Sequence, residues 1–351
     1  MRYSILIVFL SAILQGQEAT SGFDLRTTLS TDASYTHQSN DPLTGGFRDL
    51  LYPTWKLSEH WTLTAAVEVH STPFDYEEFS EPGHSVKTNV LQANLSYSRF
   101  WKAGSVVVRV GELSSAFGSF LLRYDDAVNP LIDVPPSYGY YYKPVSDLGL
   151  AGAQVDATLG KMDARVQFTT SSPTNPRTIL QSDQYPNWTG GIGYTLWQGF
   201  HVGASTFHGP YLDRQDPYYF PGEVPPRDLP ATAYGVDVQY GRGPWNLFGE
   251  WQHFQMDYHV IPTFREQTGY AEARRVLNPR WYVAARVGYV RADAFPEYQI
   301  YEIVTGFRPN RYQLAKIGYE IQQGPGIRGI LANVFTVQLV TSLHLVSITR
   351  N

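Results

Sequence analysis

Charged side chains that could act on a solute gather in one long segment of this 351-residue sequence, between residues 109 and 143. Arg109, Arg123, Asp125 and Asp126 are the best candidates, because opposed charges across a narrow passage set a transverse electric field. The same charges would also form ion pairs that hold the segment against a wall of the protein. The sequence leaves both roles open for these four residues.

Signals for catalysis or metal binding are weak. No G-x-S-x-G sequence occurs, so no nucleophile elbow is indicated. His253 and His259 stand six residues apart, a spacing that fits no strong metal pattern. The chain has no cysteine, which excludes disulfides and zinc–thiolate sites. We expect no catalytic residue, no metal and no cofactor.

The composition excludes further classes. Apolar residues make up 43% of the chain, too many for a disordered protein. The net charge of −5 argues against nucleic acid as a partner. Arg2 and the apolar run 3–14 predict a signal peptide over residues 1–19, cleaved between 16 and 19. Residues 20–351 are then a single domain, and no apolar run after residue 14 is long enough for a spanning helix.

Apolar and polar residues alternate through most of this domain, as in Trp61-Thr-Leu-Thr-Ala-Ala-Val67-Glu-Val-His70. Such a period of two predicts strands with one apolar and one polar face. Sixteen strands are expected, at 23–35, 47–57, 60–71, 86–100, 104–112, 148–159, 162–172, 187–197, 200–209, 231–241, 244–257, 267–277, 280–291, 297–307, 310–323 and 332–348.

The links between these strands alternate between tight turns, such as 198–199, and long loops, such as 210–230. Aromatic residues mark the strand ends, and the strands are near the ten residues that cross a bilayer when tilted. These features predict an all-β fold, a transmembrane antiparallel β-barrel in a Gram-negative type of outer membrane, with membrane lipids as partners. A soluble all-β architecture shares the alternation and is the alternative.

The longest link, 113–147, is too apolar to extend freely into water. We expect this third extracellular loop to fold into the barrel and narrow it, since sixteen strands otherwise leave an open channel. A cap over the outer mouth is the alternative. Tyr138 and Tyr140–Tyr142 would either stack on sugar rings or pack within the loop.

The run Arg109-Val-Gly111-Glu-Leu-Ser-Ser-Ala-Phe117-Gly118 resembles the strand-to-constriction segment of the phosphate-selective porin O/P family. The runs Arg311–Glu320 and Phe335–Leu339 resemble that family's closing hairpin. The resemblance implies a sixteen-stranded outer-membrane porin, commonly a homotrimer, with an inward-folded third loop.

Alternation gives the predicted pore seven charges of each sign, which departs from a phosphate-selective basic lumen. We therefore expect a mixed-charge porin for passive diffusion of small hydrophilic solutes or ions. The rival readings are an outer-membrane lipid or ester hydrolase and a non-conducting structural or adhesion barrel. The predicted constriction and lumen residues are Arg109, Arg123, Asp125, Asp126, Arg165, Arg286, Lys316, Glu68 and Glu250.

Overall fold

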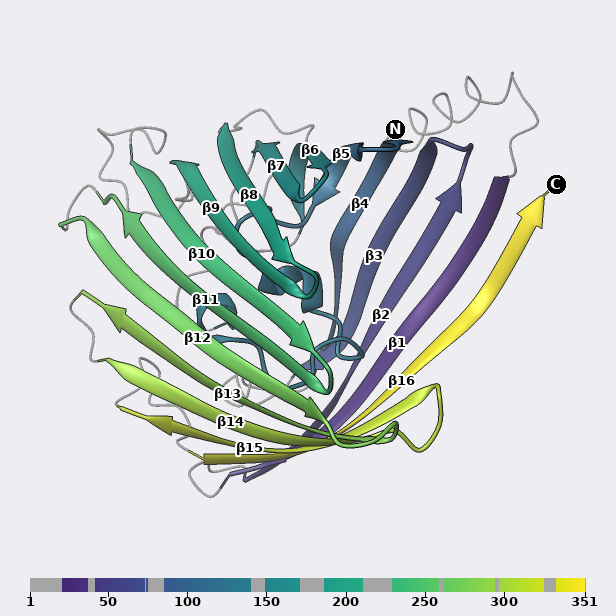
Figure 1. The fold of residues 1–351 in the computed structure, drawn as a ribbon. Coiled ribbons are helices and arrows are strands. Elements are labelled where there is room, and N and C mark those ends of the chain that lie inside the picture. The colour runs from purple at the N-terminus through teal and green to yellow at the C-terminus, as the bar shows by residue number, and fades with distance from the viewer. Residues whose placement is uncertain are drawn as a thin grey trace.

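Sixteen antiparallel strands close into one barrel in the computed structural model (Figure 1). The structure describes residues 21–36, 42–72, 74, 85–139, 149–170, 186–210, 229–258, 262–293, 297–324 and 333–350. The strands are β1 Ser21–Tyr35, β2 Leu43–Lys56, β3 Trp61–Thr72, β4 Ser85–Trp101, β5 Gly104–Leu113, β6 Leu150–Leu159, β7 Met162–Thr169, β8 Asn187–Trp197, β9 Phe200–Pro210, β10 Pro230–Arg242, β11 Trp245–Met256, β12 Phe264–Val276, β13 Trp281–Ala292, β14 Tyr298–Phe307, β15 Gln313–Gln323 and β16 Asn333–Arg350.

Each strand pairs with its sequence neighbours, and β1 pairs with β16 to close the barrel. Closure matters because lipid cannot satisfy the free N–H and C=O groups of an open sheet edge. The predicted barrel and its strand count are confirmed. The predicted signal peptide, residues 1–19, lies outside the described residues.

The largest boundary error is in β2, which begins at Leu43 rather than at residue 47. Thr44, Gly45 and Gly46 continue the pairing with β1, and Asp32 accepts a hydrogen bond from the Gly46 amide at 3.0 Å. These three residues show no alternation of apolar and polar side chains, so their pairing with β1 could not be predicted from the sequence pattern.

The two faces of the barrel differ in chemistry. Large apolar side chains such as Val166, Ile192 and Ile303 are exposed on the outer face. Polar and charged side chains such as Glu250, Gln252 and Lys316 are buried on the inner face. An apolar exterior around a polar interior is the pattern of a barrel that sits in lipid.

Exposed aromatic residues form two bands on the outer face. One band follows the tight-turn end of the strands, and the other lies toward the long-loop end. The first includes Trp55, Trp61, Trp101, Trp197, Trp245 and Trp281, and the second includes Phe168, Trp188, Tyr234, Tyr301, Tyr319 and Phe335. Such bands sit at the two lipid–water boundaries of membrane barrels.

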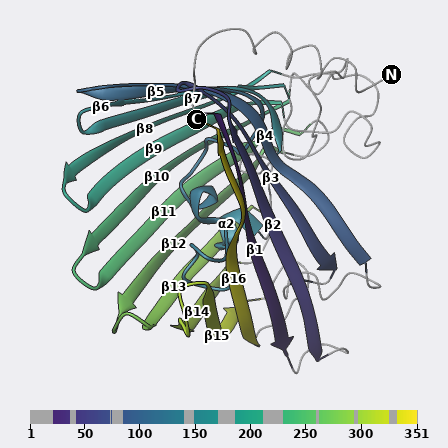
Figure 2. The same cartoon turned by 90° about the vertical axis from the view of Figure 1, so that its right-hand side faces the viewer.

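Two short helices lie in the long link between β5 and β6: the 3₁₀-helix η2, Phe120–Arg123, and the α-helix α2, Pro136–Gly139. Helix α2 contacts β12 and β13 (Figure 2). We call residues 114–139 the β5–β6 segment. Among the described residues, no helix has the length and apolar character needed to cross a membrane.

Candidate functional site

The first anchor of the β5–β6 segment is the Glu250 carboxylate on β11. Ser119 donates to it from both its backbone N and its hydroxyl, each at 3.1 Å. Tyr138 donates its hydroxyl to the same carboxylate at 2.7 Å. Gly118 is needed beside them, because its φ of +75° is left-handed and a Cβ would overlap Tyr138 and Glu250. The start and the end of the segment therefore meet on one wall residue.

Apolar contacts hold the segment to the same side of the barrel. Phe117 is fully buried, and its ring lies 5.8 Å from that of Phe254 on β11. Leu131 is fully buried against Val304 and Leu314. Tyr138 is buried with Phe120, so the idea that it stacks on a solute is corrected. Tyr140–Tyr142 lie outside the described residues.

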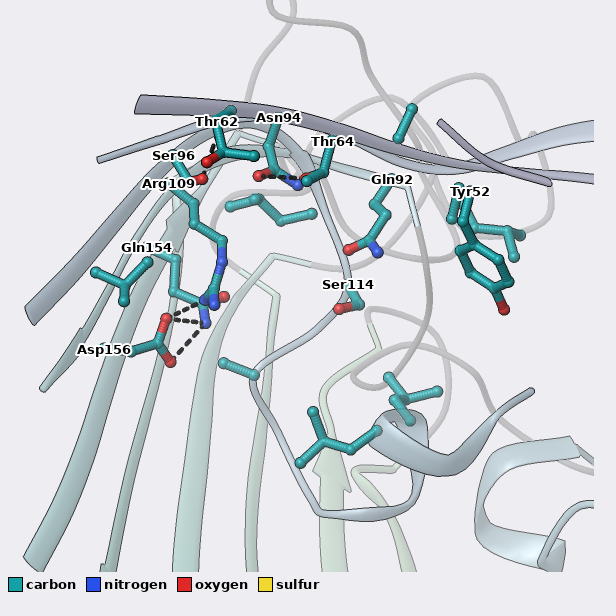
Figure 3. A pocket seen from close by; sticks show the side chains of 18 of the residues that line it. Tyr52, Thr62, Thr64, Gln92, Asn94, Ser96, Arg109, Ser114, Gln154 and Asp156 are labelled. Atoms are coloured by element: carbon teal, nitrogen blue, oxygen red, sulfur yellow. Dashed lines mark hydrogen bonds and ion pairs between the residues drawn. The ribbon is translucent and has the colours of Figure 1, made fainter. Parts of the chain in front are cut away.

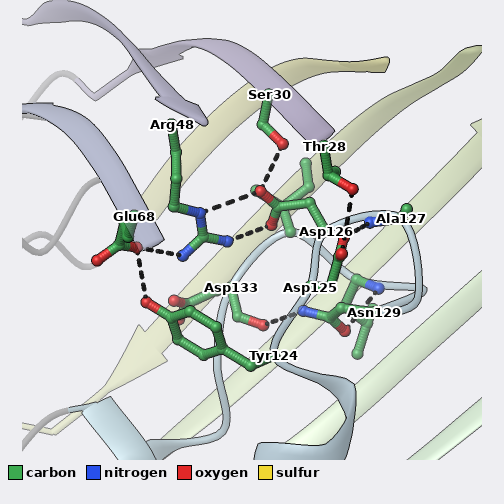
Figure 4. Close-up of polar contacts among 12 residues, drawn as sticks. Thr28, Ser30, Arg48, Glu68, Tyr124, Asp125, Asp126, Ala127, Asn129 and Asp133 are labelled. Carbon is green, nitrogen blue, oxygen red and sulfur yellow. Dashed lines mark hydrogen bonds and ion pairs between the residues drawn. The ribbon is translucent and has the colours of Figure 1, made fainter. Parts of the chain in front are cut away.

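The second anchor is Asp126, which reaches across to β1, β2 and β15 (Figure 4). Arg48 Nη2 donates to Asp126 Oδ1 at 2.5 Å, and the Ser30 hydroxyl donates to Oδ2 at 2.5 Å. Lys316 Nζ donates to the Asp126 carbonyl at 2.8 Å. Burial alone would raise the pKa of Asp126, but the charges of Arg48 and Lys316 outweigh it and lower the pKa below its ordinary 3.8.

Neighbouring groups extend this anchor. Arg48 Nη1 also lies 3.7 Å from the Glu68 carboxylate on β3. The Tyr124 hydroxyl donates to Glu68 at 3.0 Å, and burial raises the pKa of this phenol well above its usual value. Asp125 accepts a hydrogen bond from Thr28 at 3.1 Å (Figure 4) and another from the Tyr52 hydroxyl at 2.7 Å.

A third anchor joins the segment to β12–β14. Arg123 Nη1 lies 2.7 Å from the Glu272 carboxylate, and Arg286 Nη2 donates to the Asp133 carbonyl at 2.7 Å. Glu302 accepts from the Asp133 amide at 3.2 Å and lies 3.2 Å from Arg286. Buried pairs of this kind are costly to break, because each charge left behind would be unpaired in a dry site.

One side of the interior keeps an opening of about 630 Å³, between the segment and the wall from β1 to β7 (Figure 3). Hydroxyl and amide groups dominate the wall, with Arg109 and Asp156 paired among them. The wall residues of the opening include Tyr52, Thr54, Thr62, Thr64, Gln92, Asn94, Ser96, Arg109, Gln154, Asp156 and Arg165. The β5–β6 segment contributes Ser114, Ala116, Leu121, Leu122 and Asp125, and Leu113 stands at the end of β5.

The nine predicted pore residues divide between the opening and the anchors. Arg109, Arg165 and Asp125 line the opening. The other six lie in contacts between the segment and the wall: Arg123, Asp126, Arg286, Lys316, Glu68 and Glu250. Their role in sieving stays a prediction, while their role in holding the segment follows from these contacts.

Sequence reasoning missed three important inner residues, Arg48, Tyr52 and Glu302. Arg48 and Tyr52 stand at alternate positions of the strand expected at 47–57, so carrying the alternation along that strand finds both. Glu302 lies opposite Arg286 in the β13–β14 register. The alternation in the strand expected at 297–307 therefore indicates that Glu302 faces the interior, as Arg286 does. The count of seven charges of each sign is therefore incomplete.

Metal and histidine candidates remain unsupported. Within the described residues, no group of three His, Asp or Glu side chains could hold a metal ion. His253 lies against Tyr234, which belongs to the aromatic band toward the long-loop end, and against Trp251. The ring centroids are 4.9 and 6.3 Å away. His259 lies outside the described residues.

Comparison with known proteins identifies the fold. No family model matches the chain, and a comparison with curated proteins found no relative. Solved structures of outer-membrane porins do match. OprB of Pseudomonas putida has a TM-score of 0.62 at 13% identity, over 92% of this chain and 94% of that one. The anion-selective porin from Comamonas acidovorans has a TM-score of 0.61 at 11% identity, over 92% and 100%.

A trimer form of OmpT, an outer membrane protein of Vibrio cholerae, matches with a TM-score of 0.61 at 12% identity, over 92% of this chain and 99% of that chain. The chain thus has the sixteen-strand fold of outer-membrane porins. Identities this low establish the fold alone, so the particular resemblance to the phosphate-selective O/P family stays a prediction.

Proposed function

We propose that this chain is an outer-membrane porin through which small hydrophilic solutes or ions diffuse passively. The observation that carries the proposal is the polar opening of about 630 Å³ inside a closed barrel whose outer face is apolar. The β5–β6 segment narrows the lumen in this proposal. Sieving is by size and charge, without turnover, catalytic residue or cofactor.

The anchors give the constriction its stability. Three groups of wall carboxylates and cations hold the segment, so it keeps one shape while solutes pass. The charges that line the opening are of both signs, with Arg26, Arg109 and Arg165 opposed by Asp125 and Asp156. Weak selectivity follows from such a lining, rather than strong preference for phosphate.

Planar-bilayer recording of the refolded protein tests this proposal. Steady single-channel current with a reversal potential near zero across a salt gradient is the expected result. Strong anion selectivity that phosphate blocks would favour the O/P family function instead. Absence of current would reject the porin and favour a structural barrel, and lipid or ester hydrolysis by the same preparation would favour the enzyme.

An outer-membrane location and a homotrimer complete the proposal. On the outer face, Thr27 donates a hydrogen bond to Asp49, a carboxylate that alternation points away from the lumen. Toward the long-loop end, β3–β6 carry no aromatic residue, and Glu112 points outward on β5. Charged groups facing lipid are costly, so a second copy of the chain is a better neighbour for β2–β5.

A further inference from the structure

Leu122 is an apolar side chain in a polar interior. It lies on η2, lines the opening and is 68% exposed. Ala116 and Leu121 of the same segment also line the opening, and Leu113 lines it from the end of β5. A large apolar side chain left in water forgoes about 2 kcal/mol that burial would provide. A solute with an apolar surface would cover Leu122 and so provide part of this burial free energy.

The opposite side of the opening has a different chemistry. Thr62 and Thr64 stand on β3 and offer hydroxyl groups, and the buried side chains of Asn94 and Ser96 on β4 support them (Figure 3). A hydrogen bond of 3.2 Å from Thr64 to Asn94 and one of 3.1 Å from Ser96 to the Thr62 carbonyl order this wall. Groups of this kind both donate and accept, and they carry no charge.

Two of the three arginines that line the opening lie beside a carboxylate, since Arg26 Nε is 3.5 Å from Asp24 and Arg109 is paired with Asp156. Asp156 is paired with Arg109 and accepts from Gln154 Nε2 at 2.9 Å. Asp125 accepts from Tyr52 and Thr28. A charged solute therefore gains little from the paired Arg26, Arg109 and Asp156 in exchange for its hydration, and the two further charges at the opening, Arg165 and Asp125, are of opposite sign.

We propose that the opening favours uncharged, hydroxyl-rich ring solutes of sugar size. One face of such a ring is made of C–H groups and fits Leu121 and Leu122, while its hydroxyl edge fits the Thr62 and Thr64 hydroxyls of β3. This specificity rests on the proposed porin function. Leu122 determines this preference by contacting the solute, which passes through chemically unchanged.

Swelling of liposomes that contain the refolded protein tests this inference. The probes are glucose, a ring, and sorbitol, a linear chain with the same kind of hydroxyl groups. Glucose is expected to enter faster than sorbitol. Leu122→Asn keeps the size of the side chain but removes its apolar surface, and it should lower the glucose-to-sorbitol rate ratio about three-fold, the effect of losing part of one methylene contact.

Val128→Asn is the matched control, because Val128 is 53% exposed on the same segment but lines a neighbouring cavity, with Leu343 and His344, away from Thr62 and Thr64. The control should leave the ratio unchanged. With normal conductance, a glucose-to-sorbitol ratio near one in the wild type would overturn the ring preference, and an unchanged ratio in Leu122→Asn would overturn the role of Leu122; both results leave the porin standing. Absence of conductance in the wild type would instead reject the porin itself.

Discussion

Arg48 and Asp126 lie 78 positions apart in the sequence and form a buried pair, with Arg48 Nη2 2.5 Å from Asp126 Oδ1. Arg48 projects from β2, and Asp126 belongs to the β5–β6 segment. The pair thus ties the β5–β6 segment to β2. Loosening it should change both stability and current.

Asp126→Asn should destabilise the barrel by roughly 3–5 kcal/mol, because Arg48 would lose the charge that compensates it in a buried site. Single-channel current should become larger and noisier as the segment loosens. The double variant Arg48→Met with Asp126→Leu should recover part of the lost stability, because both charges of the pair leave together, while Glu68 keeps its hydrogen bond from Tyr124 and Lys316 keeps the backbone carbonyl of residue 126. Equal stability of the wild type and Asp126→Asn in urea would contradict this account of the anchor.

Acid should release the same anchor only at low pH. The pKa of Asp126 is lowered in the folded protein, so its stabilisation is present above the ordinary carboxyl pKa and is lost as pH falls through the lower folded value. Current noise should therefore stay constant from pH 7 to about 4 and rise only below that. A rise centred between pH 5 and 6 would mean that another group controls the segment.

Gly118→Ala should disturb the Glu250 anchor more than left-handed backbone strain alone would. A Cβ at Gly118 would overlap Tyr138 and Glu250, whereas a Cβ at Gly243 meets nothing within 4 Å. Both glycines have positive φ, so Gly243→Ala measures the strain term, roughly 1–2 kcal/mol. Thermal unfolding should show the larger loss for Gly118→Ala, and equal losses would count against the anchor.

Arg165→Gln should shift the reversal potential toward cations, since it removes one of the positive charges that line the opening. Arg286→Gln removes a charge of the same sign from a buried anchor, where Glu302 and Glu272 face it. That variant should lower stability more than it alters selectivity. The reverse pattern, measured in the same salt gradient, would place the conducting path along β12–β14.

Asp49→Leu distinguishes lipid from protein as the neighbour of β2. A lipid-facing Asp49 would make this change stabilising by roughly 1–3 kcal/mol. At an interface between copies, the change should instead weaken the trimer, which light scattering or gel migration without heating would report. A more stable barrel with unchanged mass would reject this face as the contact surface.

The strands could be predicted from sequence because alternation is local. The residues on either side of Trp61 or Val166 indicate which face of the sheet it occupies. The alternation is regular because the outer face of the barrel is apolar and the inner face is polar. The β5–β6 segment has no such period. Its contacts join Asp126 to Ser30, 96 positions away, and Ser119 to Glu250, 131 positions away. Contacts over such sequence distances depend on how the barrel closes. The charged residues could therefore be identified from the sequence, but their partners could not.

Cysteine modification tests the central claim, that current flows through the opening beside Leu122. The chain has no cysteine, so each single substitution gives one reactive thiol. Leu122 is 68% exposed at the opening, and Val166 is 61% exposed on the outer face. A bulky charged thiol reagent should reduce the current of Leu122→Cys and leave that of Val166→Cys unchanged. Full current through modified Leu122→Cys would contradict the account.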